Sequence, residues 1–226
     1  MEPMTTLGRV TTPDGNELVL YCRDRVYTIR VNGLELMTSR AHGSEEEMAR
    51  LACQAVAGTR QPRVMVAGLG MGYTLRAALG SLPRSAEVVV VELFAAVVEW
   101  CRGPLAELAA RPLDDPRVEV VVADLALHLQ RDDRTWDVIL LDVDNGPEAL
   151  TVARNDRLYS AVGLERLRSR LRPGGVLAVW SAEPDQAFAR RLRRVGLTVR
   201  CEAVPARGRG HQGPEHCVFL ARRSGG

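Results

Sequence analysis

The sequence predicts a doubly wound α/β fold with a mostly parallel sheet of seven strands and a small β appendage ahead of it. Three observations support this prediction. Short apolar runs rich in valine recur from residue 63 onward, as in strands buried on both faces of a parallel sheet. Stretches with helical periodicity separate these runs, and such alternation is typical of α/β folds. A hairpin signal precedes the first run and marks the appendage.

The appendage is expected within residues 5–40. Its strands are expected at Leu18–Cys22, Val26–Val31 and Leu34–Met37. Asn32-Gly33 predicts a tight hairpin turn, because both residues tolerate a positive φ. Ser44 and Glu47 have the spacing of a capping box, which predicts a helix through about residue 57. We therefore expect residues 1–57 to form a β hairpin appendage and a leading helix.

Residues 58–226 are expected to form the main, nucleoside-binding domain. Five strands are expected at Val64–Ala67, Val88–Val91, Val118–Val122, Val138–Leu141 and Val176–Trp180. A final hairpin of Leu197–Val204 and His216–Ala221 would complete the sheet. Helices are expected at Thr74–Leu79, Ala95–Ala109, Tyr159–Leu171 and Asp185–Val195. In such open sheets, ligands bind beyond the carboxyl ends of the strands.

The composition excludes several classes of function. All 30 basic residues are arginine, which excludes chemistry that needs a lysine amine, such as a Schiff base or a Walker-type phosphate site. A net charge of +2 and 4% aromatic residues do not indicate a nucleic-acid partner. Met1–Asn16 lacks a signal-peptide core, and no apolar run approaches about 18 residues. We therefore expect a soluble, cytoplasmic protein without a membrane partner.

The cysteines and histidines do not form a recognisable metal motif. The five cysteines are widely spaced and form no CxxC pair, so we expect free thiols and no zinc ribbon. These residues are Cys22, Cys53, Cys101, Cys201 and Cys217. His211 and His216 lie with Glu215 in a Gly/Pro-rich stretch, which is a poor ligand set. We therefore expect no metal cofactor.

A glycine-rich loop follows the first apolar run and opens a helix. Its glycines are Gly68, Gly70 and Gly72. Glycine lets the backbone approach a ligand closely, although a tight turn without a ligand is the alternative. Glu92 follows Gly72 by 20 residues, at the end of the second strand, where a carboxylate can accept both ribose hydroxyls. Tyr73 occupies the place of the third glycine of a dinucleotide loop, so this Rossmann-like pattern favours a nucleoside over NAD.

Two further strand ends carry acids. Asp124 ends the third strand, where it can accept from an adenine amine and also cap a helix; Leu125 beside it is counted with the ligand-binding residues. Asp142 ends the fourth strand and can stabilise a cationic sulfonium or accept a proton. Asp144 is a second catalytic candidate, with turn chemistry before Gly146-Pro147 as the alternative. We expect Glu92, Asp124 and Asp142 to gather around one adenosine.

From about Leu18 to Val179, the chain resembles the spermidine synthase group of class I S-adenosylmethionine-dependent transferases. The matching stretches are GLGMGYTLR (68–76), VVEL (90–93), LDDPRVEVVVAD (113–124), WDVILLD (136–142) and LRPGGVLAV (171–179). The resemblance implies that Glu92 binds ribose, that Asp124 binds adenine and that Asp142 lies beside the reacting centre. It also implies a homodimer that uses S-adenosylmethionine or its decarboxylated form.

The residues that bind polyamine in this family are replaced here. The replacements are Met71, Leu36 or Met37, Glu45 with Glu46, and Asn145, in place of an Asp, a Gln, a Tyr-His pair and a second Asp, respectively. The Asp at the Met71 position holds the aminopropyl amine in the family. A buried amine would lose its charge partner there, at a cost of several kcal/mol.

We therefore expect first an alkyltransferase, most simply a methyltransferase, that uses S-adenosylmethionine and a small-molecule acceptor. An aminopropyltransferase with decarboxylated S-adenosylmethionine and a cationic amine acceptor is the alternative, and a catalytically silent nucleoside-binding protein is a third. Asp142 would lie next to the acceptor, with Asp144 or Asn145 orienting it. Residues Glu45–Glu47 could meet a cationic acceptor, although a solvated helix start also explains them.

Overall fold

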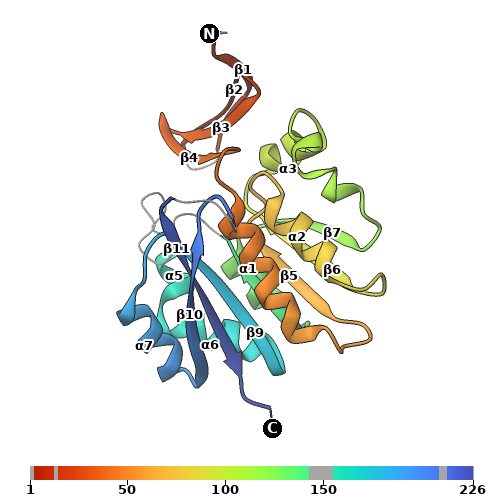
Figure 1. Ribbon diagram of the computed structural model, residues 1–226, viewed down its shortest axis with the longest axis vertical. Coiled ribbons are helices and arrows are strands. Elements are labelled where there is room, and N and C mark those ends of the chain that lie inside the picture. The colour runs from red at the N-terminus through yellow and green to blue at the C-terminus, as the bar shows by residue number, and fades with distance from the viewer. Residues whose placement is uncertain (1–2, 13–14, 143–154, 209–212, 226) are drawn as a thin grey trace.

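The computed structural model describes residues 3–12, 15–142, 155–208 and 213–225. These residues form a four-stranded sheet from the N-terminal part of the chain and a seven-stranded sheet flanked by helices. Figure 1 shows the smaller sheet at one end of the molecule and the C-terminus at the other. The predicted fold class, a Rossmann-like α/β domain with a small N-terminal β appendage, is confirmed.

The smaller sheet is antiparallel and follows the order of the chain. Its strands are β1 (Thr5–Thr11), β2 (Glu17–Arg23), β3 (Val26–Val31) and β4 (Leu34–Thr38). Asn32 and Gly33 have φ angles of 49° and 81° in the predicted turn between β3 and β4. The sequence pattern does not predict β1, because TTLGRVT is largely polar and exposed and is held by its pairing with β2.

The larger sheet has the strand order β10-β11-β9-β8-β5-β6-β7. Its strands are β5 (Arg63–Ala67), β6 (Glu87–Glu92), β7 (Val118–Val122), β8 (Trp136–Leu141), β9 (Leu171–Ser181), β10 (Leu197–Pro205) and β11 (Glu215–Arg223). The strands β5 to β9 are parallel, and β10 and β11 form an antiparallel hairpin. The chain runs from β5 to β6 and β7 on one side and then crosses to β8 on the other. This reversal marks the usual ligand crevice of an open α/β sheet.

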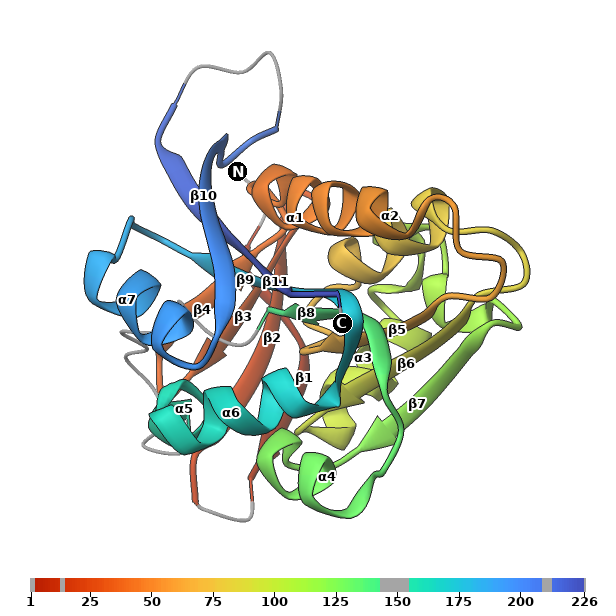
Figure 2. The ribbon, with the colours of Figure 1, turned by 90° about the horizontal axis from the view of Figure 1, so that it is seen from below.

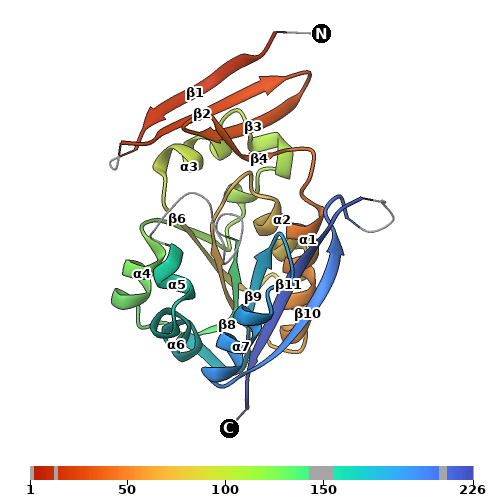
Figure 3. The same cartoon turned by 90° about the vertical axis from the view of Figure 1, so that its left-hand side faces the viewer.

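Helices cover both faces of the larger sheet. They are α1 (Gly43–Cys53), α2 (Tyr73–Ser81), α3 (Ala95–Arg102), α4 (Leu125–Arg131), α5 (Asn155–Tyr159), α6 (Ala161–Arg170) and α7 (Gln186–Arg194). Figure 2 shows α1 and α2 on one face and α4, α5 and α6 on the other. Figure 3 shows these layers from the side, below the smaller sheet. Within the described ranges, no helix has the length and apolar character needed to cross a membrane.

The apolar runs form a core on each side of the sheet. Successive residues of a strand point to opposite faces. In β5, Val64 and Val66 pack with buried residues of α1, α2 and α3, whereas Met65 and Ala67 pack with those of α4 to α7. Both faces of the central strands are therefore covered, which explains why their sequences are continuously apolar.

Two predicted helices have bounds that differ from those expected. The helix expected over Ala95–Ala109 stops at Arg102, and residues 106–109 form a separate 3₁₀ turn. The helix expected over Tyr159–Leu171 is divided, because Ser160 has extended backbone angles and its hydroxyl caps α6 by accepting from the Gly163 N–H at 3.1 Å. Both breaks come from local backbone geometry that helical periodicity does not record.

The predicted capping box at Ser44 and Glu47 is wrong. The N-cap residue of α1 is His42, without a side-chain cap. Ser44 is buried and contacts side chains of the larger sheet instead, and Glu47 pairs with Arg50 on the same helix. Tertiary contacts therefore use both side chains that the local motif assigned to the helix start.

The expectation that all cysteines are free thiols is also wrong. Cys201 and Cys217 form a disulfide between β10 and β11, with Cα atoms 6.1 Å apart. The hairpin register places Cys201 opposite Phe219 and Cys217 opposite Ala203, so the two cysteines are diagonal neighbours. Counting spacings along the sequence does not reveal this register.

Candidate functional site

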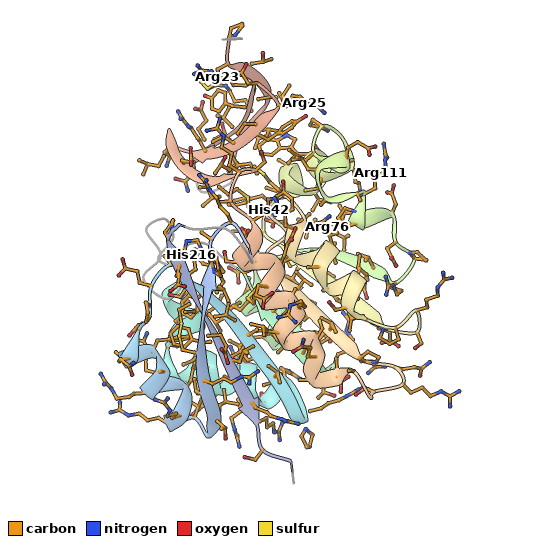
Figure 4. The ribbon with its side chains drawn as sticks, viewed as in Figure 1. Arg23, Arg25, His42, Arg76, Arg111 and His216 are labelled. Carbon is orange, nitrogen blue, oxygen red and sulfur yellow. A yellow bond between two sulfur atoms is a disulfide. The ribbon has the colours of Figure 1, made fainter. Side chains whose placement is uncertain are left out.

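A cavity of about 1050 Å³ lies at the carboxyl ends of the central parallel strands. Six of the predicted site residues line it: Gly68, Gly70, Glu92, Asp124, Leu125 and Asp142. The other walls come from β4, from the start of α1, and from the segment between β9 and α7. Figure 4 shows His42 and His216 at this end of the larger sheet, which faces the smaller sheet. The strand-end acids therefore surround one open space, as the sequence predicts.

Backbone hydrogen bonds hold the strand ends together at the cavity. The N–H of Gly68 donates to the carbonyl of Val91 at 2.9 Å, and the N–H of Asp142 donates to that of Ala67 at 2.9 Å. The N–H of Ala123 donates to the carbonyl of Glu92, also at 2.9 Å. These bonds continue the sheet pairing past the strands, so the acids at their ends project from a rigid edge.

The glycine loop adopts a backbone that favours glycine. Gly70 has a φ of 52°, and a Cβ atom there would lie 2.7 Å from the Cε atom of Met37. Gly72 has a φ of 87° and is the N-cap residue of α2, but it is not among the described residues that line the cavity. Of the three loop glycines, Gly68 and Gly70 are therefore placed to approach a ligand, and Gly72 serves the turn into the helix.

Glu92 is a buried carboxylate that the backbone orients. Its Oε2 atom accepts from the N–H of Leu69 at 2.9 Å, and its Oε1 atom accepts from the N–H of Phe94 at 2.8 Å. The residue is 7% exposed. Hydrogen bonds to the charged form favour ionisation of a carboxyl group. The two bonds also tie the glycine loop to the end of β6, so the acid and the loop are positioned as one unit.

Asp124 is the N-cap residue of α4, and its Oδ1 atom accepts from the N–H of Leu127 at 3.1 Å. The capping role that the sequence suggests is therefore present. Asp124 and Leu125 also line the cavity next to Phe94 and Val97. A flat apolar ring with an amine edge would fit between such apolar side chains and a carboxylate.

Asp142 lies beside the glycine loop, and the hydroxyl of Thr74 donates to its Oδ2 atom at 2.5 Å. Thr74 is buried at the start of α2. Its role is not predicted from the sequence, although its position directly after the glycine loop is a usable signal. The other two candidates that follow this strand in the sequence, Asp144 and Asn145, lie outside the described residues.

The three glutamates at the start of α1 have different surroundings. Glu45 lines the cavity. Glu46 forms an ion pair with Arg76 and lies 3.0 Å from Nδ1 of His42, and Glu47 pairs with Arg50. Burial raises the pKa of Glu45 well above its usual value, and the nearby charges of Asp142 and then Glu46 raise it further. The alternative interpretation, in which these glutamates simply mark a solvated helix start, therefore does not fully describe any of the three.

A chain of hydrogen bonds links α1 to the larger sheet at the cavity wall. The Nε1–H of Trp180 donates to the Ser44 hydroxyl at 2.9 Å, and that hydroxyl lies 2.9 Å from Nδ1 of His216. The Ser44 hydroxyl has two lone pairs, so it can accept from Trp180 and either donate to Nδ1 or accept from it, according to the tautomer of His216. Burial lowers the pKa of His216 and so favours the neutral ring.

The residues that replace the polyamine-binding pattern lie in different places. Met71 is buried in the apolar core and is not among the described residues that line the cavity. Leu36 and Met37 both line it from β4. Side chains at the polar positions of the family pattern are therefore apolar here, whereas Glu45 of α1 and Asp142, which follows β8, are among the acids that line the cavity.

Among the described residues, no group of three or more His, Cys, Asp and Glu side chains is arranged to hold a metal ion. His211 lies outside the described residues. The expectation that the protein uses no metal remains a prediction.

Relatives of this chain carry names that point to one enzyme class. It is 40% identical over 147 residues to "Polyamine aminopropyltransferase 2" of Pseudomonas aeruginosa, a match that covers 60% of this chain and 40% of the relative. It is 38% identical over 149 residues to "Polyamine aminopropyltransferase" of Synechococcus sp., covering 64% of this chain and 45% of the relative. The matches span less than half the length of these relatives.

Solved structures agree with the fold. A spermidine synthase crystallised with the transition-state analogue AdoDATO superposes with a TM-score of 0.78 at 19% identity, covering 97% of this chain and 74% of that one. Residues 42–187 match the profile of the spermine/spermidine synthase domain. That match includes the glycine loop, the strand-end acids and the start of α1. On this ground, the chain belongs to the spermine/spermidine synthase domain family.

Proposed function

We propose that this protein transfers an aminopropyl group from decarboxylated S-adenosylmethionine to an amine acceptor. The observation that carries the proposal is the meeting of Glu92, Asp124 and Asp142 at one cavity in a chain that matches the family over residues 42–187. The names of the curated relatives support aminopropyl transfer over methyl transfer, which the sequence analysis places first.

The nucleoside would bind along the strand ends. Glu92 would accept hydrogen bonds from the ribose hydroxyls, because its carboxylate faces the cavity from a fixed orientation. Asp124 would accept from the adenine amine, with the ring between apolar side chains that include Phe94 and Val97. Gly68 and Gly70 would leave room for the ribose and the sulfur. The acceptor would then lie between Asp142 and α1.

The reaction would be a displacement at carbon. The nitrogen of the acceptor attacks the aminopropyl carbon bonded to the sulfonium sulfur, so a C–N bond forms and the C–S bond breaks. Methylthioadenosine leaves as a neutral thioether, and the new secondary amine releases a proton. Asp142 would accept that proton, and Thr74 would hold its carboxylate in place through the 2.5 Å hydrogen bond.

Methyl transfer from S-adenosylmethionine is the second candidate. Met71 favours it, because an apolar side chain buried in the core stands where the family carries a carboxylate for the aminopropyl amine. A catalytically silent nucleoside-binding protein is the third. The three hypotheses differ in product: methylthioadenosine, S-adenosylhomocysteine or none.

The test is a turnover assay of the purified protein with each donor and a panel of small amines, read by mass spectrometry. Methylthioadenosine together with an aminopropylated amine supports the proposal, and Asp142→Asn should then reduce the rate about 10²- to 10⁴-fold. S-adenosylhomocysteine as the product would establish methyl transfer instead. Binding of a donor without any product over the whole panel would favour the silent protein.

Three other expectations remain predictions: the homodimer, the cytoplasmic location, and the division of the chain at residue 57. Light scattering of the purified protein tests the first, and expression of residues 58–226 alone tests the third. Helix α1 packs against α2 and β9 of the main domain, so removing residues 1–57 would expose apolar surface.

A further inference from the structure

Only one of the three consecutive glutamates at the start of α1 faces the cavity without a cation beside it. Glu46 is paired with Arg76 and His42, and Glu47 is paired with Arg50. Glu45 lines the cavity, and its Oε2 atom is buried with no hydrogen-bond partner among the described residues. Of these adjacent glutamates, two have a charged partner, whereas one carboxyl oxygen of Glu45 has no hydrogen-bond partner within the described ranges.

The groups around Glu45 are mostly acidic or neutral. Asp142, which follows β8, lines the same cavity and raises the pKa of Glu45, after the larger effect of burial. From α2, burial and then the charge of Glu45 raise the pKa of Tyr73 to about 12, and Arg76 is engaged by Glu46. From β11, burial lowers the pKa of His216, which favours its neutral ring. Among the described residues, no arginine therefore forms an ion pair with Glu45.

A buried carboxyl group without a hydrogen-bond partner is costly, and proteins usually satisfy or remove it. The cost is understandable if a ligand supplies the partner. A ligand that donates hydrogen bonds to the ionised carboxylate would satisfy it, and beside a second carboxylate such a ligand should be a cation. A primary ammonium group meets both requirements, and it has three donors for two acids.

We propose that Glu45 is a specificity-determining residue that holds a primary ammonium group of the substrate in the cavity opposite Asp142. This inference rests on the proposed function and names the residue that recognises the amine. It assigns to α1 the charge that the glycine loop of this chain lacks, since Met71 is buried in the core there. The ammonium belongs either to the aminopropyl arm of the donor or to the far end of a diamine acceptor.

Binding should release a proton. Without substrate, burial and the charge of Asp142 keep Glu45 protonated to a higher pH than an ordinary glutamate. An arriving ammonium stabilises the carboxylate, so Glu45 loses its proton to solvent as the ion pair forms. A neutral glutamine would bind the ammonium more weakly and would release no proton.

The test is calorimetric titration of the full chain and two variants with three probes. Methylthioadenosine fills the nucleoside site but has no amine, decarboxylated S-adenosylmethionine adds the aminopropyl amine, and 1,4-diaminobutane supplies an acceptor amine. Each titration is repeated in two buffers of different ionisation enthalpy, which counts the protons released. Glu47→Gln is the matched control, because it changes the same residue type on the same helix away from the cavity.

We expect Glu45→Gln to weaken one of the two amine probes about 10- to 100-fold, the range for a hydrogen bond to a charged group. Methylthioadenosine should bind as before, and Glu47→Gln should bind all three probes as the unchanged chain does. The probe that weakens identifies the amine that Glu45 holds. Proton release with that probe should disappear in Glu45→Gln, and Glu45→Asp should retain part of the affinity.

The proposal is overturned if Glu45→Gln binds both amine probes with unchanged affinity, or if the unchanged chain binds neither. This result is distinct from failure of the proposed function. If amine binding depends on Glu45 but no product forms, aminopropyl transfer is refuted and the amine site is supported. If Glu45→Gln forms the aminopropylated product with unchanged kcat and KM, aminopropyl transfer is supported and the amine site at Glu45 is refuted. Thermal unfolding of each variant checks that it is folded.

Discussion

Replacing Glu92 by glutamine should destabilise the protein even before any ligand is added. The carboxylate accepts from two backbone N–H groups, of Leu69 and Phe94, and is 7% exposed. A glutamine oxygen can accept from only one of them, and its NH₂ group then faces the other donor. We expect a loss of about 2–4 kcal/mol in unfolding free energy, from one charge-assisted bond and one buried N–H left unsatisfied.

The assay is urea unfolding of the unliganded protein, compared with Glu87→Gln as a control. Glu87 lies on the same strand, but it is exposed and pairs with exposed Arg63, so its loss should cost less than about 1 kcal/mol. Methylthioadenosine should raise the unfolding midpoint of the unchanged chain and of the control, and raise that of Glu92→Gln much less. If Glu92→Gln and Glu87→Gln unfold at the same urea concentration, the backbone clamp at Glu92 is not real.

Three more outcomes follow from the site. Glu45 has a raised pKa in the folded protein, so folding stability should fall as pH rises from the ordinary glutamate value through the folded pKa; Glu45→Gln should match the unchanged chain near pH 4 and exceed it near pH 8 in urea unfolding. Gly70→Ala should cost about 1–2 kcal/mol from its positive φ, plus displacement of Met37, and an unchanged melting temperature would contradict this. Thr74→Val should lower kcat with little change in donor KM, whereas Thr74→Ser should restore it, because the hydroxyl acts through Asp142; equal kcat values in both variants would refute that role.

The choice between methyl and aminopropyl transfer depends on whether another acid replaces the carboxylate that the family carries at the position of Met71. The sequence places methyl transfer first, because Met71 removes a carboxylate from the glycine loop. The names of the relatives favour aminopropyl transfer. The structure adds that Glu45 and Asp142 line the same cavity, so an amine would still find two acids there. These two acids line the cavity although the glycine loop carries none, and a motif-by-motif comparison does not register this.

The positions of the strands along the chain and the acids at their ends could be predicted, because both are local in the sequence. A valine-rich run of four or five residues followed by glycine or an acid defines a buried strand and its carboxyl end. Parallel connection then brings Gly68, Glu92, Asp124 and Asp142 to one edge, as the cavity lining shows. The strand β1 escaped prediction, because its residues are mostly exposed and it is held by antiparallel pairing with β2.

The sequence by itself therefore determined the fold class, the seven strands and the edge at which the acids gather, since periodicity and strand-end position suffice for these. Only the tertiary structure decided how Ser44, Glu45 and Cys201 are used. Ser44 bonds to Trp180 and His216, more than a hundred residues away, and Cys201 meets its partner through a hairpin register. Glu45 differs from its two neighbours only in the direction that α1 gives it. Such roles come from contacts between distant segments, which exist only once the core has packed.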